Sequence, residues 1–154
     1  MELEKDFKEL LKLFNKNKVR YCVVGAYAVA FYSKPRYSKD IDLLVEPDLE
    51  NGKKIIKSLR EFGFSSLKLK PEDFEREGAI IQLGYEPVRV DLLTSISGSK
   101  FKEIWRGRKT SKIAGQKIII IGFRELIKSK KISNRPIDKI DVDYLLKFKN
   151  KRSR

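Results

Sequence analysis

Histidine is absent from the 154 residues of this chain, and cysteine and tryptophan occur once each. Without histidine the chain has no imidazole general base, no Ser-His-Asp triad and no histidine metal ligand. The single cysteine, Cys22, lies in the apolar segment YCVVG and has no second cysteine to form an internal disulfide, which suits a reducing cytoplasm and a packing role for the thiol. Any catalysis must therefore rest on carboxylates, lysine or arginine, with a hard metal ion bound through oxygen.

Long apolar runs are also missing. No stretch approaches the ~20 residues that a membrane-spanning helix needs. The N-terminal segment MELEKDFKELLKLF is amphipathic and carries acidic residues, unlike a signal peptide. We therefore expect a cytoplasmic protein with no membrane partner.

Basic residues outnumber acidic ones by 35 to 21, and the excess is concentrated in one part of the chain. Residues 1–50 carry no net charge, residues 51–100 carry +2 and residues 101–154 carry +12. A positive surface of this kind favours a polyanionic partner, and we expect that partner to be RNA. The alternative is a composition rich in lysine and isoleucine of the kind found in thermophiles, which keeps a protein soluble without any nucleic acid.

Helical and strand periodicities alternate along the chain, with at least one hairpin and no repeat or linker. The helical segments are 2–16, 26–32, 47–62, 123–131 and a last helix from about 136. The short apolar runs are 20–25, 41–45, 79–84, 88–93 and two around 114–115, and 64–69 could add another. This order predicts one α/β or α+β domain at 1–146, with a mixed sheet of about five strands flanked by helices. We expect residues 147–154 to form a basic, flexible tail.

Two aspartates, Asp40 and Asp42, stand at the front of the apolar run DIDLLV. Residues i and i+2 of a strand point to the same side, so the two carboxylates project together. Such a pair repels unless a cation lies between its members, and Mg²⁺ is the natural cation where no histidine or cysteine is nearby. The alternative is that Asp40 lies in the preceding loop and caps it locally, as aspartate often does.

A third carboxylate, Asp91, enters the apolar strand VRVDLL on the same face as Arg89. If this strand neighbours 41–45, three carboxylates converge in the arrangement that two metal ions require for phosphoryl transfer. Upstream, the order strand, Gly25 and helix start lets backbone N–H groups meet a phosphate.

The segment VVGAYAVAFYSKPRYSKDIDLLV resembles the signature of the DNA polymerase β-type nucleotidyltransferase superfamily: a strand, Gly-Gly or Gly-Ser, a spacer and Asp-x-Asp. RYSKDID is similar to the R-x-T-x-D-x-D of the small AbiEii-like and minimal nucleotidyltransferases of toxin systems, with Ser38 in place of Thr. VRVDLLTSISG matches the strand of the third acid. RELIKSKKISNRPIDKIDVDYLL matches L-I-x-x-K followed by R-x-x-D-x-x-D-x-x-x-L, so the resemblance covers residues ~20–146.

The resemblance implies the polymerase β-like fold and a metal site, for Mg²⁺ or Mn²⁺, made by Asp40, Asp42 and Asp91. Asp91 would also activate the acceptor hydroxyl. The nucleotide-binding positions that it implies are Gly25, Ala26, Arg36, Ser38, Lys130, Arg135 and Asp138. Of these, Lys130 is expected to approach the triphosphate. Arg135, Asp138 and the following Asp141 could bind substrate or merely order their helix, since Asp138 and Asp141 share a helical face.

The chain departs from the family pattern at two places. Ala26 replaces the second Gly or Ser, so a hydroxyl contact to phosphate is missing. Tyr32 and Ser33 stand where relatives often have His-Gly. Elsewhere, Trp105 beside Arg106, Arg108 and Lys109 could stack a base or belong to the core or its rim.

These features predict an enzyme that moves a nucleoside monophosphate from a nucleoside triphosphate to an acceptor hydroxyl. RNA, such as a tRNA 3′ end, is the acceptor that the charge favours, and protein hydroxyls or a small molecule such as an aminoglycoside are alternatives. A toxin role, with an antitoxin protein as partner, is a further expectation. The competing hypothesis is an inactive module of the same fold that binds nucleic acid or a partner protein, which Ala26 favours.

Overall fold

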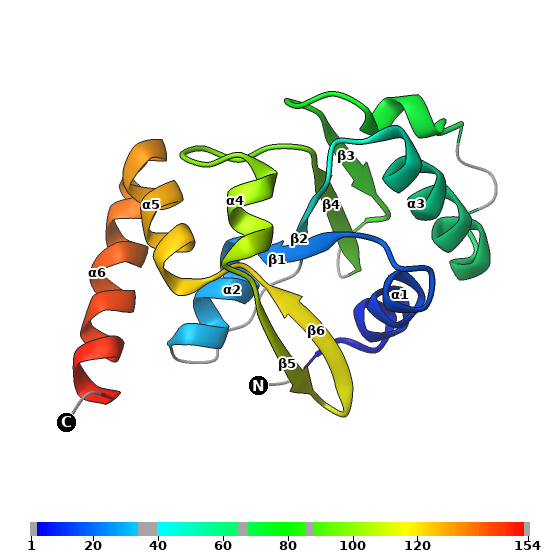
Figure 1. The fold of residues 1–154 in the computed structure, drawn as a ribbon. Coiled ribbons are helices and arrows are strands. Elements are labelled where there is room, and N and C mark those ends of the chain that lie inside the picture. The colour runs from blue at the N-terminus through cyan, green and yellow to red at the C-terminus, as the bar shows by residue number, and fades with distance from the viewer. Residues whose placement is uncertain (1–2, 34–39, 65–67, 86–87, 153–154) are drawn as a thin grey trace.

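The computed structural model describes residues 3–33, 40–64, 68–85 and 88–152, with side chains as far as residue 149. Its strands are β1 (Tyr21–Val24), β2 (Asp40–Val45), β3 (Ile80–Leu83), β4 (Arg89–Leu93), β5 (Lys109–Ile113) and β6 (Gln116–Ile120). Its helices are α1 (Lys5–Lys16), α2 (Gly25–Tyr32), α3 (Leu49–Phe62), the 3₁₀ helix η1 (Pro71–Phe74), α4 (Phe101–Arg106), α5 (Phe123–Ser133) and α6 (Pro136–Arg152). Figure 1 shows α5 and α6 side by side at one end of the molecule, with α1 and α3 at the other.

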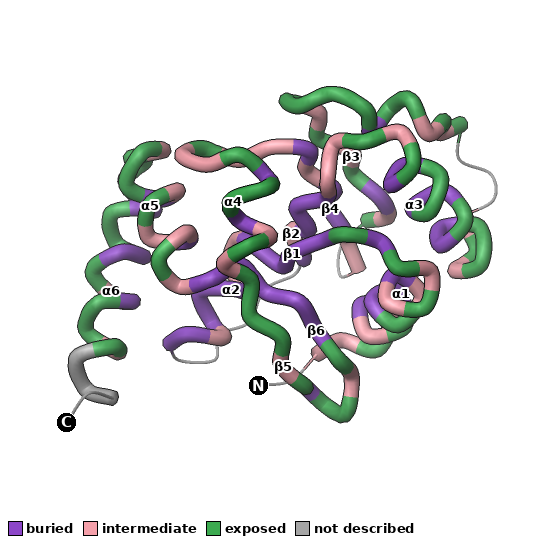
Figure 2. The backbone as a smooth tube through the Cα atoms, in the orientation of Figure 1, coloured by how far each residue is buried: buried purple, intermediate pink, exposed green. Residues whose placement is uncertain are grey.

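The strands form one mixed sheet in the order β3-β4-β2-β1-β6-β5. Two parallel pairs, β2 with β4 and β1 with β6, alternate with three antiparallel pairs. β1 and β2 occupy the centre, and their apolar residues are almost completely buried. A strand covered on both faces reads as a continuous apolar run, as YCVV does. Figure 2 shows this buried centre and the exposed outer surfaces of the helices.

The turn from α1 into β1 determines where β1 begins. The N–H of Val19 donates to the carbonyl of Phe14 at 2.9 Å, and that of Lys18 donates to Asn15 at 3.1 Å. These are the two hydrogen bonds of a Schellman motif, in which the residue after the helix end takes the left-handed conformation. Lys18 does so with φ +57°.

The predicted fold is confirmed: the chain is a mixed α/β protein with helices flanking a mixed sheet. The helix predicted at 47–62 is α3, which starts after its cap Asp48 and ends at Gly63 with φ +116°. The sheet has six strands among the described residues, against the expected number of about five, and they correspond to the apolar runs at 20–25, 41–45, 79–84, 88–93 and the two around 114–115.

Two other expectations concern the edges of the described region. The optional strand at 64–69 falls partly outside it, and Phe64, Lys68 and Leu69 belong to no strand. The expected tail at 147–154 overlaps α6, which continues to Arg152 and so makes residues 147–152 helical. The division of the chain into a domain at 1–146 and a tail stays a prediction.

Candidate metal and nucleotide site

The three aspartates that the sequence singles out come together where β2 runs parallel to β4. The register places Asp42 opposite Asp91 and Asp40 opposite Arg89. One carboxylate oxygen from each of the three aspartates lies within 4.8 Å of the others. The convergence predicted from alternation along two strands is therefore confirmed, and Asp40 belongs to β2 rather than to the preceding loop.

The three carboxylates repel one another at this distance. Burial, followed by the charges of Asp40 and Asp91, raises the pKa of Asp42 from its ordinary 3.8 to about 6. A cation between the carboxylates would remove that repulsion. Three carboxylate oxygens with no histidine or thiol form a donor set that suits Mg²⁺ or Mn²⁺. The residues present thus fit a divalent cation.

Gly25 makes room for this cluster. β1 and β2 are antiparallel with Val24 opposite Asp42, so the turn from β1 into α2 passes beside the Asp42 carboxylate. A Cβ built on Gly25 would overlap Asp42 Oδ2 and lie 3.1 Å from Cγ. Gly25 also has φ +67°, a conformation that side chains disfavour. A glycine is therefore required here because Asp42 occupies the space of a side chain, a reason that the sequence does not reveal.

Arg89 is a site residue to which the sequence analysis assigned no function. Its guanidinium binds both oxygens of Asp91, with Nε 3.1 Å from Oδ1 and Nη2 2.9 Å from Oδ2. Hydrogen bonding to Asp91 raises the pKa of Arg89, and the charge of Arg89 lowers the pKa of Asp42 against the stronger effects that raise it. The spacing R-x-D on one strand face was the available signal, since it puts a cation beside the third carboxylate.

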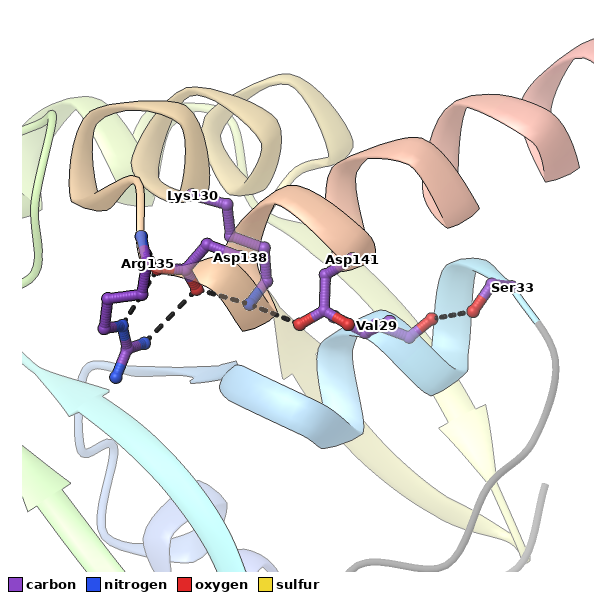
Figure 3. Close-up of polar contacts among 6 residues, drawn as sticks. All are labelled: Val29, Ser33, Lys130, Arg135, Asp138 and Asp141. Carbon is purple, nitrogen blue, oxygen red and sulfur yellow. Dashed lines mark hydrogen bonds and ion pairs between the residues drawn. The ribbon is translucent and has the colours of Figure 1, made fainter.

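Lys130 joins α5 to α6 (Figure 3). Its ammonium lies 3.0 Å from Asp141 Oδ2 and 3.4 Å from Asp138 Oδ1, and its side chain is only 11% exposed. Asp138 and Asp141 thus share one helical face, as predicted, and that face meets Lys130. The expected contact between Lys130 and a triphosphate stays a prediction.

Arg135, just before α6, is held by the same network. The backbone N–H and Nε of Arg135 donate to Asp138 Oδ2 at 3.1 and 2.9 Å. Burial would raise the pKa of Asp138, but hydrogen bonds from Arg135 and Ser133 and the charge of Lys130 hold it well below its ordinary value. Asp42 adds weakly to the raised pKa of Arg135, after Asp138 and Asp141. The side chain of Arg135 is 69% exposed.

The remaining predicted positions lie around α2. Ala26 is the second residue of α2 and is half-buried. Tyr32 and Ser33, the second departure from the family pattern, stand at the end of α2. The Tyr32 hydroxyl donates to the Ile121 carbonyl at 2.7 Å, and the Ser33 hydroxyl donates to the Val29 carbonyl. Arg36 and Ser38 lie outside the described residues.

Among the residues that the structure describes, no helix is both long and apolar enough to cross a membrane.

Comparison with known proteins places this fold. No protein-family model and no curated protein sequence matches the chain. Among solved structures, the lincosamide antibiotic adenylyltransferase LnuA, bound to lincomycin, aligns with a TM-score of 0.61 and 17% identity over 96% of this chain and 98% of its own. A candidate nucleotidyltransferase of Thermotoga maritima, TM1012, aligns with a TM-score of 0.60 and 17% identity over 94% and 91% of the two chains.

ANT(2″)-Ia, in complex with adenylyl-2″-tobramycin, aligns with a TM-score of 0.52 and 13% identity over 90% of this chain and 84% of its own. At these identities the likeness concerns the fold. The fold that carries the three carboxylates in this chain is the nucleotidyltransferase fold.

Proposed function

We propose that this protein is a metal-dependent nucleotidyltransferase, which moves a nucleoside monophosphate from a nucleoside triphosphate to an acceptor hydroxyl. The observation that carries the proposal is the cluster of Asp40, Asp42 and Asp91 on adjacent parallel strands, with oxygens within 4.8 Å of one another. The nucleotidyltransferase fold of the chain supports it.

In this proposal Asp40 and Asp42 hold Mg²⁺ or Mn²⁺ with Asp91. When bound, the cation would neutralise the triphosphate and stabilise the charge that develops during transfer. Asp91, oriented by Arg89, accepts the proton of the acceptor hydroxyl as that oxygen attacks the α-phosphorus. The leaving group is pyrophosphate.

The nucleotide is proposed to lie against the start of α2. The backbone N–H groups of Gly25 and Ala26 would meet the phosphates there, because the first N–H groups of a helix have no partner within that helix. Ala26 offers no hydroxyl, so backbone N–H groups and a cationic side chain must bind the phosphates instead. Arg135 is an exposed cation whose pKa is raised in small part by the charge of Asp42, and we assign it to the triphosphate together with Arg36 and Ser38. Asp138, expected to bind substrate or to order its helix, accepts hydrogen bonds from Arg135 and so supports its position. Lys130 pairs with Asp138, and its expected contact with the triphosphate stays part of the proposal.

RNA is the acceptor that the charge distribution favours, because residues 101–154 carry +12. A small molecule is the second candidate, because one structural neighbour is bound to lincomycin and another is in complex with adenylyl-2″-tobramycin. The two acceptors make different demands: a small molecule needs only the space beside the carboxylates, whereas RNA needs a basic surface beyond them. A toxin role would require an antitoxin partner, which the adjacent gene would encode. This role would not change the proposed transfer reaction.

The test is transfer of label from each α-³²P nucleoside triphosphate, with Mg²⁺ or Mn²⁺, to total RNA, to tRNA and to a panel of aminoglycosides and lincosamides. We expect transfer that depends on the metal and is lost in Asp42→Asn. Asp143→Asn, which changes an exposed acid of α6, is the matched control and should retain activity. Equal transfer by wild type and Asp42→Asn would reject the assigned metal site.

The alternative is a module of this fold that binds without turnover, which the missing hydroxyl at Ala26 favours. It predicts no label transfer to any acceptor, together with RNA binding that ignores metal and triphosphate. Restoring the hydroxyl with Ala26→Ser separates the two: an active enzyme should bind the triphosphate more tightly, and an inactive module should not respond.

A further inference from the structure

A basic pocket lies at the opposite end of β1 from the carboxylate cluster. It has a volume of about 290 Å³ and is formed by the end of α1, the turn into β1, α4 and the β5–β6 hairpin. Its cationic lining residues are Lys18, Arg20, Arg108 and Lys117, all exposed. None of the described residues that line it is acidic, although Glu46, outside the pocket, pairs with Arg20 at 3.2 Å. The pocket is therefore suited to an anion.

One wall of the pocket is planar. The guanidinium carbon of Arg108 lies 4.0 Å from the centroid of the Trp105 ring, and Arg108 Nη1 donates to the Trp105 carbonyl at 2.6 Å. Phe101 stacks on Trp105 with centroids 5.7 Å apart but does not line the pocket. Arg20 also lies over the Trp105 ring, at 5.6 Å. The guanidinium of Arg108, with the indole behind it, is thus the flat group offered to a ligand. A guanidinium held flat on an aromatic ring can stack on a base.

Lys18 enters the pocket from an unfavourable backbone position. It is the left-handed residue of the Schellman turn, with φ +57°, where glycine or asparagine is favoured. A lysine there gives the turn no conformational advantage. Its presence is explained if the ammonium is needed in the pocket, since strained residues concentrate at functional positions.

The pocket is separate from the carboxylate site. Arg20 precedes Val24, the partner of Asp42, by four residues, which corresponds to roughly 13 Å along an extended strand. A triphosphate at the carboxylates would not occupy it. An RNA strand could reach both places, because its phosphates repeat along its length.

We propose that this pocket binds a nucleotide unit of single-stranded RNA, with the base stacked on the Arg108 guanidinium that Trp105 supports and the flanking phosphates bound by Lys18 and Lys117. A planar wall combined with separate cations matches a base between phosphates better than it matches a simple anion. Binding does not require turnover, and only the role of this strand as the acceptor rests on the proposed function. A free nucleotide offers the same base and phosphate, so the experiment separates the two.

Trp105 is the sole tryptophan of the chain, so its fluorescence reports on this pocket without a label. We expect quenching by an oligoribonucleotide of about ten nucleotides, within the range of single-strand site sizes. Affinity measured separately, by anisotropy of a labelled strand, should fall roughly tenfold in Arg108→Gln, as loss of one stacking contact predicts. Absence of quenching, or unchanged affinity in Arg108→Gln, would overturn the proposal.

Lys18→Asn distinguishes a binding role from a structural one. It removes the charge and supplies a residue that tolerates the left-handed conformation, so Tm should stay constant or rise while RNA affinity falls. The slope of log K against log salt should decrease by about 0.7. Lys12→Asn, at an exposed position of α1 outside the pocket, is the control and should leave affinity nearly unchanged. Equal losses in the two variants would show general electrostatic attraction and reject the pocket.

Three further arms complete the test. AMP should quench Trp105 far more weakly than the oligonucleotide, and equal affinity would identify a free-nucleotide site instead. Polyphosphate, which lacks bases, should compete poorly, and equal competition would reject base stacking. Asp42→Asn should bind the strand like the wild type. If transfer fails in every assay but this binding persists, the proposed function is rejected and the proposed RNA-binding pocket is supported.

Discussion

At the scale of single residues, the candidate site depends on the fit between Gly25 and Asp42. The carboxylate of Asp42 occupies the space that a side chain on Gly25 would need, and the backbone there has φ +67°. Any other residue at position 25 must both adopt a disfavoured conformation and displace an aspartate of the cluster.

Gly25→Ala should weaken Mn²⁺ binding at least about tenfold, because moving one ligand out of place costs on the order of 1.4 kcal/mol or more. Electron paramagnetic resonance of free Mn²⁺ measures this directly. Gly115→Ala is the matched control: Gly115 has φ +79° but no atom within 4 Å of an added Cβ. It should lose stability without losing Mn²⁺ affinity. Similar Mn²⁺ affinities in both variants would contradict the positioning role of Gly25.

Asp42→Asn should raise the Tm of the metal-free protein at neutral pH, because it removes one of three mutually repelling carboxylates. We expect a rise of about 2–4 °C, the shift that ~1 kcal/mol produces in a chain of this length. Mn²⁺ should stabilise the wild type but not the variant. A lower metal-free Tm in Asp42→Asn would show that the carboxylate is held by favourable contacts instead.

At the scale of elements, ion pairs between side chains hold α5 against α6, in addition to apolar contacts. Lys130 is buried between Asp138 and Asp141, and Asp138 also accepts three hydrogen bonds from Arg135. Breaking a buried pair on one side leaves an uncompensated charge, which costs about 3–5 kcal/mol. We expect the free energy of unfolding to fall by this amount in Lys130→Met. Arg135 should also lose the position in which Asp138 holds it.

The pH dependence of stability follows from Asp138. Its folded-state pKa lies well below the ordinary value of 3.8, so its stabilisation is complete above pH ~4 and is lost as the pH falls through the folded pKa. Urea unfolding between pH 5 and 3 should therefore show a steeper loss of ΔG in the wild type than in Asp138→Asn. Parallel curves would mean that Asp138 titrates normally in the folded protein.

At the scale of the whole molecule, the net charge of +14 acts against compactness. Salt should screen this repulsion, because the Debye length falls from roughly 14 Å at 0.05 M to about 4 Å at 0.5 M. We expect Tm to rise by a few degrees over this range, measured in NaCl by circular dichroism. Replacing exposed Lys102 and Lys112 with glutamine should reduce the rise in Tm more than replacing Lys5 and Lys12, which lie in the N-terminal third, where the net charge is zero. A fall in Tm with salt would show that ion pairs outweigh the net repulsion.

The positions that sequence reasoning located correctly share one property: their geometry is local. Alternation along a strand put Asp40 and Asp42 on one face, and helical spacing put Asp138 and Asp141 on another. The helix predicted at 47–62 is bounded by its cap Asp48 and by Gly63, two residues next to its ends. In each case a few neighbouring residues determine the result.

Apart from the convergence of Asp91 with Asp40 and Asp42, contacts between distant segments escaped prediction. Asn51 is 2% exposed, and its side chain bonds to the backbone of Arg20 and Glu46, joining the start of β1 to the end of β2. No local pattern distinguishes this asparagine from one on a surface. The basic pocket has the same origin, since its lining comes from α1, α4 and the β5–β6 hairpin.

The amino-acid sequence alone sets which chemical groups this protein has: carboxylates without histidine, and a basic C-terminal third. It also indicates where strands and helices begin and end. Tertiary structure alone decided which of those groups meet. Parallel pairing of β2 with β4 brought Asp91 to Asp42, and packing of α5 on α6 buried Lys130 between two acids. The physical reason is that side-chain direction follows from the backbone period, whereas strand order and helix packing depend on contacts across the whole chain.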